Sequence, residues 1–175
     1  MRRSVFILIC ALLLVGCGGC QEKNIPPQLT DKQVEQGLIN MHRMELGLES
    51  KRIDLWLSKK GWTMDESNTG LRYEIQNVDS LNLISSGDFI QCEYTIRLLD
   101  STMCYSSEIN GPLQFEVGMA DVVTGMHEAA QMMSKDASGK FVLPARLGYG
   151  LSGDQQKIPG NSPLWLEMTV KEVAK

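Results

Sequence analysis

Side chains that could make or break bonds are few in this 175-residue chain, and they are widely separated. The two histidines, His42 and His127, stand apart, and no group of His, Cys, Asp and Glu has metal-ligand spacing. Three of the five cysteines lie in the first twenty residues. The other two, Cys92 and Cys104, could form a disulfide in an oxidising compartment, but spacing alone does not place them within reach. We expect no metal and no cofactor.

The N-terminus has the pattern of a secretory signal. Two arginines follow Met1, an apolar run extends from Val5 to Val15, and Gly16-Cys17 comes next. The run is shorter than the about 20 apolar residues that a membrane-spanning helix needs. Leu14-Val15-Gly16-Cys17 is similar to the bacterial lipobox, in which the cysteine is diacylated and begins the mature chain. The alternative is an ordinary cleaved signal with an incidental cysteine.

These features predict a lipid-anchored protein of the bacterial cell envelope, on the periplasmic face of the outer membrane. Residues 1–16 are the signal, Cys17 is the lipidated residue, and residues 17–29 are a tether without structure of its own. Several acyl chains make membrane attachment stable. Removal of the signal leaves 15 basic and 21 acidic side chains, a net charge of −6. This balance excludes a nucleic-acid partner that binds through a basic surface.

Residues 30–62 are predicted to form a helical arm. Thr30 and Asp31 are good capping residues, and apolar residues follow at steps of three and four. The pattern allows one long helix or two short ones, because Gly37 and Gly47 weaken it and Ser50 could begin a second helix. The arm is too short to form its own core, so it should pack on a domain or extend from it. Its apolar positions are Val34, Leu38, Met41, Met44 and Leu48.

From residue 70 onward, alternation with a period of two replaces the helical pattern. Strands before and after one short helix indicate an antiparallel sheet wrapped around that helix, an α+β fold. We place this domain at residues 70–175. The expected strands are 71–75, 90–98, 112–118, 141–143 and 164–173, and the expected helix lies within 122–133.

Four ordered motifs then identify a family. They are V-V-T-G-M-H-E at 122–128, L-P-A-R-L-G-Y-G at 143–150, I-P-G-N at 158–161 and L-W-L-E-M at 164–168. At matching distances they resemble V-I-x-G-W-x-E, I-P-x-x-L-A-Y-G, I-P-P-N and L-x-F-x-V of the FK506-binding protein (FKBP) family of peptidyl-prolyl cis-trans isomerases. The arm resembles that of lipid-anchored FKBPs of the Bacteroidetes, including those associated with gliding motility.

The resemblance implies an FKBP-like half-barrel, an antiparallel sheet curled around one short helix, with an apolar pocket between the two. An X-Pro bond isomerises slowly because its partial double bond must rotate. A pocket that desolvates the amide and prefers the twisted state lowers that barrier without a nucleophile, metal or proton transfer. The implied partners are proline-containing polypeptides, and the implied role is to assist the folding of exported proteins.

The resemblance assigns five positions to the catalytic pocket. Tyr94 is the aromatic wall from the first long strand. Val122 and Val123 are the aliphatic pair before the helix, and the Val123 N–H is a donor. The Tyr149 hydroxyl reaches a substrate carbonyl, and Ile158 belongs to an overhanging loop.

Five other pocket positions carry residues that differ from the family's. Met126 replaces a tryptophan floor, and Tyr105 replaces an aspartate acceptor. Such a pocket should remain apolar but be softer. A second interpretation therefore stays open: a catalytically weak FKBP-like chaperone, or a subunit of an envelope complex, whose arm forms a homodimer or binds a partner. The remaining three positions, which replace phenylalanines, are Cys104, Leu113 and Leu166.

Overall fold

The computed structural model describes residues 29–119 and 121–175. The predicted signal, the lipidation site Cys17 and all of the tether but its last residue lie outside the described residues. The chain divides into two compact units, the second of which is Asn40–Lys175. None of the helices in the described residues has the length and apolar character to cross a membrane.

Helix α2 is a single helix, Asp31–Lys60, and Ser50 begins no second one. At its start, Gln33 Oε1 accepts the Thr30 N–H at 2.9 Å, one half of a capping box. Lys59 and Lys60 lie in the last turn, where positive charge complements the helix dipole. The helix ends at Gly61, whose φ of 67° is the left-handed conformation that glycine adopts without strain.

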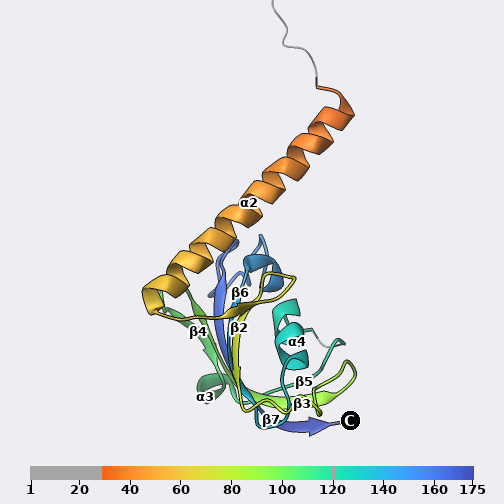
Figure 1. Ribbon diagram of the computed structural model, residues 1–175, viewed down its shortest axis with the longest axis vertical. Helices are drawn as coiled ribbons and strands as arrows, with labels where there is room; N and C mark the ends of the chain where they lie inside the picture. The colour runs from red at the N-terminus through yellow and green to blue at the C-terminus, as the bar shows by residue number, and fades with distance from the viewer. Residues whose placement is uncertain (1–28, 120) are drawn as a thin grey trace, which may run out of the picture. The chain divides into compact units, whose positions relative to one another are not determined.

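Seven antiparallel strands form one sheet, and helix α4 (Thr124–Gln131) lies on its inner face (Figure 1). The predicted antiparallel α+β fold around one short helix is confirmed. The strand order is β1-β2-β6-β7-β3-β4, with β5 paired to β3. Helix α3 (Ser107–Asn110) and the 3-10 helix η1 (Ala145–Leu147) are short. The strands are β1 (Asp65–Glu66), β2 (Arg72–Gln76), β3 (Phe89–Leu98), β4 (Met103–Ser106), β5 (Leu113–Glu116), β6 (Ser138–Leu143) and β7 (Leu164–Ala174).

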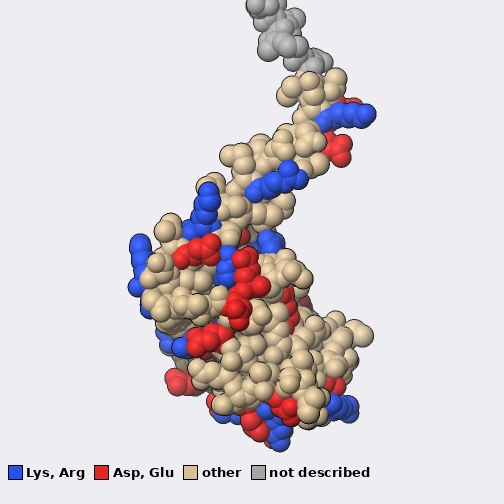
Figure 2. Space-filling model, viewed as in Figure 1, with Lys and Arg blue, Asp and Glu red and all other residues tan. Residues whose placement is uncertain are grey.

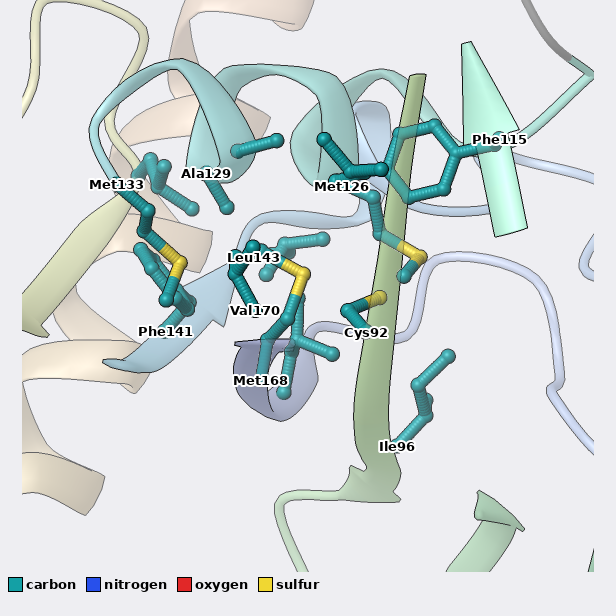
Figure 3. Close-up of a cluster of buried hydrophobic side chains, with 14 of the residues drawn as sticks. Cys92, Ile96, Phe115, Met126, Ala129, Met133, Phe141, Leu143, Met168 and Val170 are labelled. Atoms are coloured by element: carbon teal, nitrogen blue, oxygen red, sulfur yellow. The ribbon is translucent and has the colours of Figure 1, made fainter. Parts of the chain in front are cut away.

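The core lies between α4 and the inner face of the sheet. Met126 and Ala129 of α4 point toward Phe141 and Leu143 of β6 and toward β7 (Figure 3). The alternation of β7 is as predicted, with every second residue buried. Its inward residues are Leu164, Leu166, Met168 and Val170. Cys92 and Cys104 are both buried free thiols, so the disulfide that sequence left open is not formed.

The C-terminal half of α2 covers part of the outer face of the sheet. Ile53 and Leu57 pack on Val142, whose neighbours in β6 point to the opposite, inner face. Three tryptophans close this contact: Trp62 lies 5.5 Å from Trp56 and 5.1 Å from Trp165, centroid to centroid. Within Asn40–Lys175, α2 is therefore part of the folded domain and not only an extension from it.

Arg72 of β2 adds a polar tie at the same contact, although its guanidinium is almost fully buried. It pairs with Asp54 at 2.9 Å and with Glu66 at 2.7 Å. It also donates to Ser50 Oγ and to the Gly70 carbonyl, both at 2.8 Å. These partners offset the desolvation cost of burying the positive charge. Loss of the partners would leave an unpaired buried charge, which destabilises the fold.

Gly125 allows α4 to approach the sheet closely. A Cβ at this position would lie 2.4 Å from Leu143 Cδ2 and 2.9 Å from the Leu147 carbonyl oxygen. By contrast, a Cβ at Gly47, on the exposed side of α2, would meet nothing within 4 Å.

The same substitution should therefore have opposite effects at these two glycines. Gly125→Ala is expected to lower the free energy of unfolding by about 1–3 kcal/mol, because the added methyl overpacks a contact that includes backbone. Gly47→Ala should raise it by about 0.5–1 kcal/mol, because alanine favours a helix. Urea unfolding followed by circular dichroism measures both, and a neutral Gly125→Ala would contradict the close packing.

Candidate active site

A cavity of about 470 Å³ opens between α4 and the inner face of the sheet. Tyr94 and Ile96 come from β3, and Tyr105 comes from β4. Met126 lies in the first turn of α4, and Tyr149 follows η1. The lining residues are Tyr94, Ile96, Tyr105, Leu113, Asp121, Val122, Val123, Met126 and Tyr149. The cavity is therefore mostly apolar and aromatic, with a few polar groups, as is usual in small binding sites.

The structure brings seven of the ten predicted pocket residues into this lining, and their roles remain predictions. The other three, Ile158, Cys104 and Leu166, are at most 2% exposed and belong to the core behind it. They lie on the inward side of their segments, where packing buries them completely.

Two lining residues were missed by the sequence reasoning. Ile96 stands two positions after Tyr94 on β3 and therefore shares its face, so the alternation held a signal for it. Asp121 precedes the aliphatic pair, and no pattern in the sequence singled it out.

Two polar contacts hold α4 in place beside the cavity. His127 Nδ1 accepts the Gly118 N–H at 2.8 Å, which ties the chain just after β5 to the helix. On the other side, Glu128 accepts hydrogen bonds from the Ser67 and Thr69 hydroxyls at 2.7 and 2.6 Å, which ties the turn before β2 to the helix. These contacts fix the floor that Met126 provides.

Three tyrosines line the cavity, and each is held in its neutral form. Burial raises the pKa of Tyr149, and the nearby Asp154 charge raises it further. Burial also raises the pKa of Tyr94. The hydroxyl of Tyr105 donates to Asp154, which together with desolvation raises the pKa of Tyr105 to about 12. At neutral pH all three are hydrogen-bond donors and carry no charge.

Asp154 remains ionised next to these tyrosines. Burial opposes its ionisation, but hydrogen bonds from Tyr105 and from the backbone amides of Ile158, Gln156 and Lys157 together lower the pKa of Asp154. The carboxylate is therefore an acceptor only.

The two cysteines of the domain are not poised for nucleophilic chemistry. Burial raises the pKa of Cys92 to about 12, and burial likewise raises the pKa of Cys104. A thiol held in its protonated form is a poor nucleophile. What the cavity can do is desolvate a bound amide and donate hydrogen bonds to it.

A second hollow, of about 530 Å³, lies over the outer face of the sheet. Its lining is mainly polar and includes Glu74, Glu93 and Glu167. Such a surface keeps a ligand solvated, so the inner cavity is the better candidate for desolvating an amide.

The raised pKa of Tyr105 predicts a loss of stability at alkaline pH. Its pKa is about 12 in the folded chain against a reference value of 10.0. The folded state therefore favours the neutral form, a contribution that is complete below pH 10 and is lost as the pH approaches 12. Urea unfolding across this range should show a smaller loss for Tyr105→Phe than for the wild type, and equal losses would contradict the assignment.

The comparisons with known proteins agree with this geometry. The family model of FKBP-type peptidyl-prolyl cis-trans isomerases matches residues 82–171. A peptidyl-prolyl cis-trans isomerase of Arabidopsis thaliana is 32% identical over 64% of this chain and 72% of its own length. A probable FKBP-type isomerase of Haemophilus influenzae is 31% identical over 65% of this chain, but the match spans only 47% of that relative.

The fold is shared with a solved structure as well. The crystal structure of FkpA from Escherichia coli superposes with a TM-score of 0.63 at 24% identity, covering 84% of this chain and 74% of that one. The family model spans just over half of the 175 residues. Together with the cavity between α4 and the sheet, this places the chain in the family of FKBP-type peptidyl-prolyl cis-trans isomerases.

Proposed function

We propose that this chain is an active peptidyl-prolyl cis-trans isomerase that is lipid-anchored to the envelope membrane and assists the folding of exported proteins. The observation that carries the catalytic part is the inner cavity, where an aliphatic pair, aromatic walls and a neutral tyrosine hydroxyl face one space. The anchored location is supported by the signal pattern and by Cys17.

The cavity suits rotation about an X-Pro bond. Val122, Val123 and Met126 line the cavity with apolar surface, against which we expect a proline ring to pack away from water. The Tyr149 hydroxyl, neutral at physiological pH, can donate to the carbonyl of the bound amide. Water stabilises the planar, conjugated amide of the ground state by solvating its carbonyl. An apolar site removes that solvation and favours the twisted amide, which has lost its conjugation, so the barrier to rotation is lower in the site than in water. No proton or group is transferred.

Isomerisation should depend on Tyr149 and Val123. In a prolyl-peptide assay of the full chain purified in detergent, Tyr149→Phe should lower kcat/KM about five- to tenfold, the loss of one hydrogen bond. Val123→Ala should also lower it, because apolar contact is lost. Tyr73→Phe, on β2 and outside the cavity lining, is the matched control and should keep the wild-type rate. A wild-type rate equal to that of buffer would refute the activity.

The membrane anchor should depend on Cys17 and not on Cys20. Cys17→Ser is expected to release the protein from the membrane fraction and to abolish labelling with a radioactive fatty acid, because the acylated thiol is gone. The matched variant Cys20→Ser removes a thiol three residues later and should retain both. Labelling that survives in Cys17→Ser would exclude this site of lipidation.

A binding module is the second candidate, and the arm favours it. Met41, Met44, Leu48 and Leu55 lie at steps of three, four and seven on one side of α2 and are 63% to 67% exposed. This stripe is on the side opposite Ile53 and Leu57, which pack on the sheet. A homodimer, an envelope complex or an unfolded client would bury it. A folded chain without isomerase activity in the assay above would favour this candidate.

A further inference from the structure

We propose that Tyr105 and Asp154 form a latch that fixes one wall of the prolyl pocket by holding the loop segment 154–158 against strand β4. The proposal rests on the isomerase function proposed above, because it assigns a positioning role within that same pocket. Asp154 is not a lining residue of the cavity, so it acts through Tyr105, which is one.

The first observation is that Tyr105 contacts both the cavity and the loop segment 154–158. Its ring lines the cavity, and its hydroxyl donates to Asp154 Oδ2 in the loop. The two residues are 49 positions apart in the chain. A hydrogen bond to a carboxylate is among the stronger kinds, so it restrains the ring and the loop together.

The second observation is that Asp154 also organises the loop itself. Its other oxygen, Oδ1, accepts the N–H groups of Gln156 and Lys157 at 2.9 Å and of Ile158 at 2.7 Å. Ile158 is buried in the core beneath. One carboxylate therefore folds the loop with one oxygen and attaches it to β4 with the other.

The third observation is a second attachment of the same loop to β4, three residues further along the chain. Lys157 Nζ donates to the Cys104 carbonyl at 2.9 Å and lies 4.9 Å from the centre of the Tyr105 ring. This cation–π contact presses on the face of the ring whose hydroxyl is held by Asp154. The ring is therefore held at its tip and over its face by one loop.

A wall held in this way is in place before substrate arrives. Preorganisation reduces the ordering cost of binding. The latch holds the same wall whether the bound amide is planar or twisted. Its loss should therefore weaken the binding of the planar substrate and of the twisted transition state equally. Uniform binding of this kind appears in KM and leaves kcat unchanged.

The test compares the full chain with Tyr105→Phe, Asp154→Asn and the double variant. Tyr105→Phe keeps the ring and removes only the hydroxyl, so KM for a prolyl peptide should rise about fivefold while kcat stays within about twofold. Amide hydrogen exchange at Lys157 and Ile158 should become about tenfold faster, with exchange in β7 unchanged. Tyr73→Phe should alter neither measurement.

The double variant decides whether the two residues act as a unit. Its KM should equal that of the more affected single variant, since one broken bond cannot be broken twice. Additive effects, or unchanged loop exchange in Tyr105→Phe, would overturn the latch. A wild-type chain without isomerase activity would refute the proposed function instead, and the exchange measurement would then decide on the latch alone.

Discussion

The close approach of α4 to the sheet at Gly125 is the constraint on which the site depends. Because this residue has no Cβ, the helix backbone can lie against Leu143 and the Leu147 carbonyl. That approach places Met126 as the floor of the cavity and sets the Val122–Val123 pair at its edge. The ties from Glu128 and His127 keep the helix in this position, and the tyrosines of β3, β4 and the loop after η1 enclose the remaining space.

The sheet packs against a helix on each face, α4 on the inner face and α2 on part of the outer one, whereas antiparallel sheets commonly leave one face to solvent. Phe141 and Leu143 face α4, whereas Val142 between them faces α2. The buried guanidinium of Arg72 joins Asp54 of the same helix to the Gly70 carbonyl in the turn before β2, and Glu128 joins that turn to α4. A series of contacts therefore runs from α2 to the helix that forms the pocket floor.

The strands with clear alternation, such as 90–98 and 164–173, were predictable to within about two residues because burial on one face imposes a period of two. Strand β4 was missed, since Met103–Ser106 has only four residues, too few for an alternation to stand out. Most of the pocket followed from motif spacing. The Tyr105–Asp154 contact did not, because it depends on the path of an irregular loop. The resemblance implies an aspartate at position 105; this chain has Tyr105 there, and its hydroxyl donates to Asp154.

The tryptophan cluster has a spectroscopic consequence. The chain holds three tryptophans, and all of them, Trp56, Trp62 and Trp165, gather where α2 meets the outer face of the sheet. The prolyl pocket has methionine at its floor and no indole in its lining. Intrinsic fluorescence excited at the indole band therefore reports on the docking of the arm alone. Three of the four tyrosines, Tyr94, Tyr105 and Tyr149, line the pocket. The indoles and most of the phenols therefore lie at two different places in the fold, the contact of the arm with the sheet and the pocket.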